Sequence, residues 1–248
     1  MHVGFKTDKG IIRSSNEDAC FVLPHDKVYI LADGVGGGNS GEIASRTAVS
    51  EIANYVVKHP LDGLEDKYEI VGYLRDAIEQ ANHRIYDLAM EHEENSGMAT
   101  TAIIVYVHKG KAYIGNIGDS RVYLYRNGDY LQLTEDHTYV NTLVKAGILS
   151  KEEADQDERK NVIIKALGAE PSVEPDFFQV EIMEGDILLA CSDGLYDEVS
   201  DEEIISVIKE KDNMNELAAE LVYRANRNGG RDNITVITLE ITKEEIDE

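Results

Sequence analysis

Four aspartates stand where a run of apolar residues meets a turn: Asp33, Asp119, Asp193 and Asp232. Their surroundings read VYILADG, IGNIGDSR, ILLACSDG and RDNITVITLEI. Such apolar runs are typical of β-strands, and the ends of strands in one sheet can converge although they lie far apart in the chain. Carboxylates that converge raise one another's pKa unless a cation neutralises them. Oxygen ligands without clustered His or Cys favour a hard ion such as Mg²⁺, Mn²⁺ or Ca²⁺, so the pattern predicts a metal-centred hydrolase.

Other catalytic patterns are missing from the sequence. An Asp-Gly pair taken alone is more often a turn, so the interpretation of Asp33 and Asp193 depends on the repetition at four strand ends. The seven histidines show no H-x-x-x-H or H-E-x-x-H spacing, which gives no support to zinc protease chemistry. No G-x-S-x-G elbow is present for a serine nucleophile. His137, in the run TEDH, is interpreted as a loop or capping residue rather than a catalytic acid.

Length and composition predict one domain over residues 1–248, with 242–248 as a short acidic tail. The formal net charge of −24 disfavours nucleic acid and anionic membranes as partners. Cys20 and Cys191 are interpreted as buried free thiols, which fits a reducing compartment. The N-terminus has no apolar signal region, and no run of about 18 apolar residues could span a membrane. These features predict a soluble cytoplasmic protein.

The apolar periodicity predicts the elements that must position the aspartates. Helical spacing extends to Pro60 after the first strand, and again over residues 70–88. An antiparallel meander is expected over 100–134, with turns at 109–110 and 127–129, and a further hairpin over 177–192. Residues 138–170 are expected to form short helices and loops. Helices over 201–210 and 214–226 precede a last strand, 233–241. Buried together, these elements predict an α+β fold, a four-layer α-β-β-α sandwich of two antiparallel sheets covered by helix pairs.

Eight short blocks, in order along nearly the whole chain, resemble the metal-dependent type 2C serine/threonine protein phosphatases in their compact bacterial form. The blocks are Thr7-Asp8-Lys9-Gly10 with Arg13 and Asn16-Glu17-Asp18, Ala32-Asp33-Gly34-Val35-Gly36-Gly37, Gly97-Met98-Ala99-Thr100-Thr101, Gly115-Asn116-Ile117-Gly118-Asp119-Ser120-Arg121, Leu133-Thr134-Glu135-Asp136-His137, Asn161 with Ala166-Leu167-Gly168, Ser192-Asp193-Gly194-Leu195, and Gly230-Arg231-Asp232-Asn233-Ile234-Thr235.

The resemblance implies a binuclear Mn²⁺ or Mg²⁺ site at one edge of the two sheets. Asp33 would bridge the two ions, the Gly34 carbonyl would bind one of them, and Asp193 and Asp232 would bind the other. Asp119 and Asp193 would hold a third, weaker ion. The remaining roles are implied for residues around these ligands: Glu17 and Asp18 would orient metal-bound waters, Asn233 would support the site, and Arg13 would clamp the substrate phosphate.

The implied activity is hydrolysis of phosphoserine and phosphothreonine monoesters by a hydroxide that bridges the metals, with no covalent enzyme intermediate. The implied partners are phosphorylated proteins and a cognate serine/threonine kinase in a bacterial cytoplasm, with the enzyme as a monomer. Two stretches depart from the family's common pattern. Residues 35–38 lack a histidine that often follows the first aspartate, and 157–168 differ from the usual His-Pro-x-x-Asn-x-x-Thr-Arg run. An inactive phosphatase-like binding module and a calcium-binding domain remain as alternatives.

Overall fold

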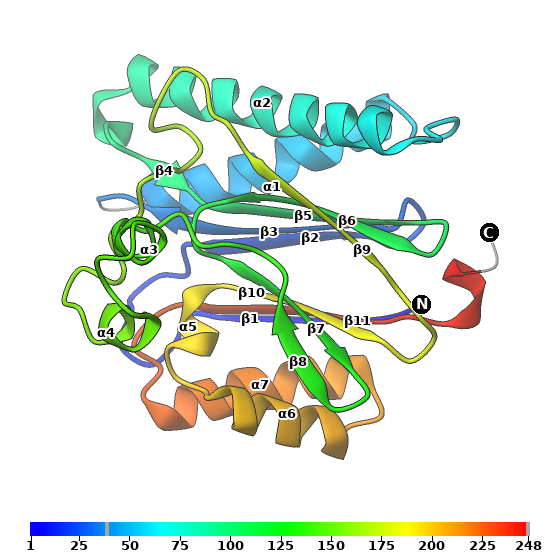
Figure 1. Ribbon diagram of the computed structural model, residues 1–248. Coiled ribbons are helices and arrows are strands. Elements are labelled where there is room, and N and C mark those ends of the chain that lie inside the picture. Colours follow the sequence, from blue (N-terminus) through cyan, green and yellow to red (C-terminus); the bar gives the residue numbers. More distant parts are fainter. Residues whose placement is uncertain (38–39, 247–248) are drawn as a thin grey trace.

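Two antiparallel β-sheets pack face to face, and helices cover the outer face of each (Figure 1). The computed structural model describes residues 1–37 and 40–246. Apolar side chains from both sheets, among them Tyr29, Ile103, Ile114 and Leu188, form a buried core between them. This arrangement confirms the predicted α+β sandwich with four layers.

The first sheet carries a helix pair on its outer face. Its strands, in spatial order, are β2 (Asp18–Leu23), β3 (Val28–Val35), β5 (Ala102–His108), β6 (Lys111–Ile117) and β9 (Asp176–Glu181), and the short β4 (Ala99–Thr100) pairs with β3. The covering helices are α1 (Ser40–Lys58) and α2 (Lys67–Glu91). Asp66 begins α2 with a capping box, in which its carboxylate accepts from the backbone of Tyr68 and Glu69. The cap extends this helix three residues upstream of the predicted start.

The second sheet is built and covered in the same way. Its strands, in spatial order, are β1 (His2–Asp8), β11 (Ile234–Glu240), β10 (Ile187–Cys191), β7 (Arg121–Arg126) and β8 (Asp129–Gln132). Helices α6 (Asp201–Glu210) and α7 (Met214–Asn228) cover it, close to their predicted bounds. Shorter helices lie in the connections: η1 (Glu93–Asn95), α3 (Tyr139–Lys145), α4 (Lys151–Asp155) and α5 (Asp193–Tyr196). A last short helix, η2 (Lys243–Glu245), follows β11. No helix in the described ranges has both the length and the apolar character needed to cross a membrane.

The predicted meander over 100–134 is wrong, because β6 and β7 belong to different sheets. The turns at Lys109-Gly110 and Asn127-Gly128 do close hairpins, and all four residues have positive φ. Between these hairpins, residues 118–120 carry the chain from the first sheet to the second. The predicted hairpin over 177–192 fails in the same way, since β9 pairs with β6 whereas β10 pairs with β7 and β11. Strands that are buried on both faces lose the alternation that would have assigned them to a sheet.

Strands β1 and β2 were not predicted. Four of the seven residues of β1 are exposed, so the strand has no apolar run to reveal it. Its one buried residue is Gly4, where a Cβ would collide with the carbonyl of Met214 at the start of α7. Of the predicted acidic tail over 242–248, residues 247–248 lie outside the described residues, and Glu245 packs against the fold instead of extending into solvent. Glu245 is buried and pairs with the α-amino group of Met1 at 2.9 Å.

Candidate active site

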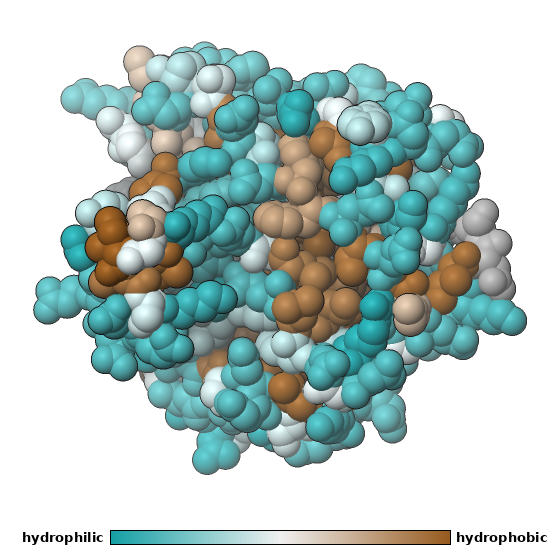
Figure 2. Space-filling view, in the orientation of Figure 1, coloured by the Kyte–Doolittle hydropathy of each residue, from teal (hydrophilic) through white to brown (hydrophobic). Residues whose placement is uncertain are grey.

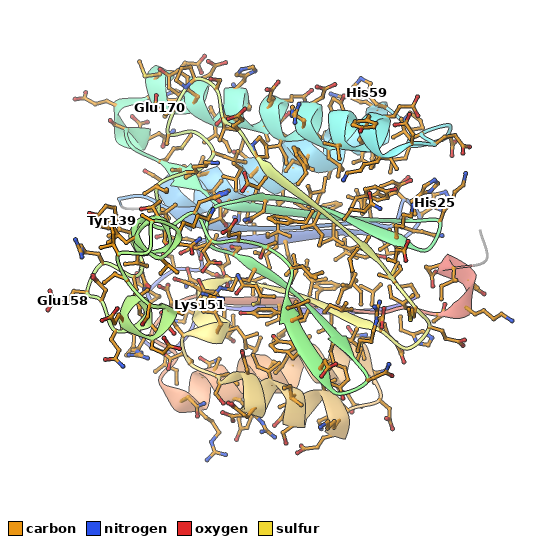
Figure 3. All side chains as sticks on the ribbon, viewed as in Figure 1. His25, His59, Tyr139, Lys151, Glu158 and Glu170 are labelled. Carbon is orange, nitrogen blue, oxygen red and sulfur yellow. The ribbon has the colours of Figure 1, made fainter. Side chains whose placement is uncertain are left out.

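Five aspartates gather at one end of the sandwich, and we call them the carboxylate cluster: Asp18, Asp33, Asp119, Asp193 and Asp232. Asp18 and Asp33 face each other directly across the β2–β3 pair. Asp119 lies in the crossing between the sheets, Asp193 begins α5, and Asp232 lies two residues before β11. In Figure 3, His25 marks the turn between β2 and β3, and the cluster belongs to the opposite end, where Tyr139 on α3 and Lys151 on α4 lie. The structure thus brings the four strand-end aspartates together, with Asp18 as a fifth.

Burial and mutual repulsion dominate the electrostatics of the cluster. Burial, reinforced by the neighbouring carboxylates, holds the pKa of Asp33 and of Asp193 well above the usual range. Burial raises the pKa of Asp18 to about 6 and that of Asp119 to about 7. For Asp33 the neighbours that raise its pKa are the four other members of the cluster. The carboxylates therefore face a common space in which negative charge is poorly neutralised.

Two buried carboxylate oxygens in the cluster have no hydrogen-bond partner within the described part of the chain. Asp18 Oδ1 and Asp193 Oδ1 are buried and accept no hydrogen bond from the described residues, although Ser192 Oγ donates to Asp18 Oδ2 at 2.7 Å. No three Asp, Glu, His or Cys side chains within 1–37 and 40–246 are arranged so that they could hold one ion as they stand. Buried unpaired carboxylates are nevertheless characteristic of cation sites, because burying a bare charge is costly. The all-oxygen donor set fits a hard divalent ion, which would neutralise the carboxylates.

Arg13 lies at the exposed side of the cluster. Its Nη2 donates to Asp232 Oδ2 at 2.6 Å, while the Arg13 side chain remains 52% exposed. The predicted phosphate-binding residue is therefore beside the predicted metal ligands, although it contacts a carboxylate here. A guanidinium is a planar fork with several donors, so part of it can face an incoming phosphate.

Asn233 joins the loop that carries Arg13 to the strand end that carries Asp232. Its Oδ1 accepts from the Glu17 amide at 2.7 Å, and its Nδ2 donates to the carbonyls of Lys9 and Ser15, each at 2.8 Å. The Asn233 amide also donates to Asp232 Oδ1 at 2.8 Å. Burial raises the pKa of Glu17 despite the opposing charge of Arg13. The Asn233 side chain thus fixes the loop that carries Arg13 and Glu17, and its backbone amide fixes Asp232.

Hydroxyl residues that sequence reasoning did not assign connect the members of the cluster. Thr101 Oγ1 accepts from the Asp33 amide at 2.9 Å and lies 2.8 Å from Ser120 Oγ, next to Asp119. Ser192, besides donating to Asp18, accepts from the Thr235 amide at 2.9 Å and so links the two sheets. Thr101 and Ser192 lie within blocks of the family pattern, which was the available signal. Nothing in their local sequence showed which residues they would contact.

Glycine allows the strand ends to approach closely around the cluster. A Cβ on Gly34 would collide with the carbonyls of Gly41 and Glu17, and one on Gly194 would collide with the carbonyl of Asn233. Both close approaches are to backbone atoms, which cannot rotate away. The Asp-Gly pairs at 33–34 and 193–194 therefore mark tight packing rather than simple turns.

Gly34→Ala is expected to destabilise the protein by about 2 kcal/mol or more, in the range of an overpacked core. The matched control is Gly72→Ala in α2, where a Cβ would meet nothing within 4 Å. Because alanine is the better helix former, this change should raise the free energy of unfolding by up to about 1 kcal/mol. Chemical denaturation of both variants measures the two effects. Equal effects of the same sign would contradict the packing described at Gly34.

Comparison with known proteins agrees with this geometry. The family model described as protein phosphatase 2C matches residues 12–235. The chain belongs to the protein phosphatase 2C family. The serine/threonine phosphatase stp of Listeria welshimeri is 39% identical over 243 residues, covering 97% of this chain and 96% of that protein.

Solved structures of the protein phosphatase 2C fold match over almost the whole chain. The serine/threonine phosphatase of S. agalactiae superposes with a TM-score of 0.89 at 34% identity, covering 97% of this chain and 99% of that one. The catalytic domain of the serine/threonine protein phosphatase PstP, in complex with two manganese ions, superposes with a TM-score of 0.85 at 33% identity and 98% coverage of both chains.

In this protein phosphatase 2C chain, a cavity of about 680 Å³ lies beside the cluster, under the segment that carries α3 and α4. Tyr196 and Asp197 of the α5 region line it, and Tyr196 also donates its hydroxyl to the Asp119 carbonyl at 3.0 Å. Lys160 reaches across to Asp197 at 2.8 Å. None of the five cluster carboxylates lines this cavity, so it adjoins the cluster rather than containing it.

Proposed function

We propose that this protein is a metal-dependent serine/threonine protein phosphatase that hydrolyses phosphoserine and phosphothreonine monoesters. The observation that carries the proposal is the carboxylate cluster, at least partly buried and incompletely neutralised, with the half-exposed guanidinium of Arg13 at its edge. Family membership supports it, as do relatives that are themselves named serine/threonine phosphatases.

We further propose roles for the individual residues. Asp33 would bridge two Mn²⁺ or Mg²⁺ ions, with the Gly34 carbonyl on one, and Asp193 and Asp232 on the other. Asp119, with Asp193, would hold a third ion more weakly. The PstP structure with two manganese ions supports the core pair by similarity. When bound, such ions supply a water nucleophile activated near neutral pH and positive charge that neutralises the phosphate oxygens.

The chain's own residues supply binding and orientation. Arg13 is placed to exchange its contact with Asp232 for one with a phosphate oxygen. Glu17 and Asp18 would orient water through their carboxylates, and Asn233 holds Glu17 in the position required for this. Because the cluster is shielded in part from water, these charge interactions are screened less than they would be at the surface.

Exposed apolar residues beside the cluster support a protein substrate. Ile148, Val162 and Ile164 are 66%, 48% and 48% exposed, and an apolar patch covers the α3 region at the left of Figure 2. Such a patch suits contacts with a polypeptide around the phosphorylated residue. We propose that the enzyme acts as a monomer on phosphoproteins in the cytoplasm, opposite a cognate serine/threonine kinase. Both cysteines are free, Cys191 buried as predicted and Cys20 only partly buried because it lies on the edge strand β2, and free thiols fit a reducing compartment.

The proposal is tested by titrating the protein separately with Mn²⁺, Mg²⁺ and Ca²⁺ while following both ion binding and phosphate release from a phosphothreonine peptide. Binding of Mn²⁺ or Mg²⁺ with hydrolysis is the expected result. If ions bind but none of the three supports hydrolysis, the proposed phosphatase activity is wrong, and a binding module or a calcium-binding domain is favoured.

Replacing Arg13 should lower kcat/KM for the substrate and leave the affinity for metal ions unchanged. We expect Arg13→Ala to lower kcat/KM for a phosphothreonine peptide by roughly 10- to 100-fold, the cost of about 1.5 to 3 kcal/mol for a hydrogen bond to a charged group. Arg84→Ala, on the exposed face of α2, is the matched control and should leave kcat/KM unchanged. If Arg13→Ala keeps full kcat/KM, the phosphate-binding role is wrong.

A further inference from the structure

His137 is buried although it lies in the loop between β8 and α3. It is 4% exposed, and four contacts hold it. Its amide donates to the Gly118 carbonyl at 2.9 Å, and its carbonyl accepts from the Ile164 amide at 2.8 Å. On the ring, Nδ1 accepts from the Gly118 amide at 3.1 Å, and Nε2 lies 3.2 Å from Asp176 Oδ2. One residue therefore ties together the crossing loop, the far end of the α3–α4 segment and the edge strand β9.

These contacts define the tautomer of the ring. A backbone N–H can only donate, so Nδ1 must present its lone pair to Gly118, and the proton must lie on Nε2, facing Asp176. Burial lowers the pKa of His137, with Lys165 and Lys145 acting in the same direction and Asp176 opposing them, which favours the neutral ring. The Nε2–Asp176 contact is close, but its geometry is too bent for a regular hydrogen bond. Asp176 therefore favours the tautomer with the proton on Nε2 mainly through its negative charge.

The residue that His137 holds directly precedes Asp119. The Gly118 amide and the Gly118 carbonyl belong to the two successive peptide units before Asp119, and His137 binds both. Gly118 has φ of +97°, and a Cβ there would meet the side chain of Thr101. Thr101 on one side and the two hydrogen bonds of His137 on the other restrict the rotation of both peptide units. The position of the Asp119 carboxylate then depends on these hydrogen bonds between His137 and Gly118.

We propose that His137, oriented by Asp176, is a positioning residue that sets the place of Asp119 and thereby the affinity of the carboxylate cluster for divalent ions. It touches neither substrate nor reacting atoms. The inference rests on the proposed function for its catalytic consequence, but its effect on ion binding can be measured without turnover. Replacing a residue that does not bind the metal itself but orients a metal ligand typically lowers metal affinity by about 10- to 100-fold.

Two substitutions separate the roles of the ring nitrogens. The amide oxygen in His137→Asn lies near the place of Nδ1 and can accept from Gly118. The longer side chain in His137→Gln carries its amide toward Asp176 and leaves the Gly118 amide without an acceptor. His83→Gln, at an exposed position on α2, makes the same chemical change as a control.

Calorimetric titration with Mn²⁺ alone should show binding at least about tenfold weaker in His137→Gln, with His137→Asn and His83→Gln close to the wild type. Equal affinities in the Asn and Gln variants would overturn the proposal. ¹⁵N NMR of the histidine rings in the wild-type protein gives a second test that no folding defect can affect. The Nε2–H tautomer supports the proposal, and the Nδ1–H tautomer rejects it. A wild type that binds Mn²⁺ but releases no phosphate would refute the proposed function and leave both tests of His137 valid.

Discussion

Asp33→Asn and Asp193→Asn should each abolish the divalent-ion-dependent release of phosphate from a phosphothreonine peptide. Asparagine keeps the size of the side chain but removes the charge that would hold the ion. Both side chains are partly buried, and the neighbouring carboxylates of the cluster raise the pKa of each. A metal ion contributes several kcal/mol of charge stabilisation in the transition state. At about 1.4 kcal/mol for each factor of ten, its loss should lower the rate by roughly a thousandfold or more.

The measurement is steady-state phosphate release over a range of Mn²⁺ concentrations, with Mn²⁺ binding followed in parallel. Asp87→Asn, on the exposed face of α2, is the matched control and should keep the wild-type rate. Unchanged turnover in both cluster variants would show that the reaction takes place elsewhere. Lost turnover with unchanged Mn²⁺ affinity would likewise reject these two residues as ligands.

The layers of the fold could be predicted because they depend on local patterns. Helix α6 was placed correctly over 201–210, since Ser200 caps it and a buried stripe through Ile204 and Val207 sets its face. The assignment of strands to sheets could not be predicted. The two hairpins around residues 118–120 look continuous in the sequence, and only packing between the sheets separates them. The crossing that results is the reason why Asp119 reaches the cluster.

The candidate site shows the same division. Repeated strand-end carboxylates were visible in the sequence because each lies next to an apolar run. The contacts that position them were not, since Thr101 meets Ser120, Ser192 meets Asp18, and His137 meets Gly118 through tertiary structure. His137 was interpreted as a loop residue, which it is, but its burial and its four contacts could not be read from the run TEDH.

The charge of the cluster leads to the last prediction, which concerns stability without metal. In the presence of a chelator, the free energy of unfolding should fall as the pH rises from about 5 to 8. Asp18 and Asp119 have pKa values of about 6 and about 7 in the folded protein, against 3.8 for an ordinary aspartate. Between these limits the folded state holds protons that the unfolded chain has released. The stability that they contribute is fully present below pH 3.8 and is lost as the pH rises through 6 to 7.

One pKa unit corresponds to about 1.4 kcal/mol, so we expect a loss of at least about 2 kcal/mol over this range. Thermal and chemical unfolding at several pH values in chelator measure it. Added Mn²⁺ should restore stability, and more at pH 8 than at pH 5, since the ion competes with protons for the same carboxylates. A chelated protein that is as stable at pH 8 as at pH 5 would contradict the raised pKa values.

The substitution that abolishes turnover should therefore stabilise the chelated protein. Asp33→Asn removes a carboxyl group whose ionisation is opposed by burial and by four neighbouring carboxylates, so at pH 8 its free energy of unfolding in chelator should exceed that of the wild type. With saturating Mn²⁺ the order should reverse, because the wild type gains the binding energy of the ion and the variant does not. A carboxylate that serves only the fold would lower stability in both conditions. The change of sign between the two conditions thus distinguishes a metal ligand from a structural aspartate, without any assay of turnover.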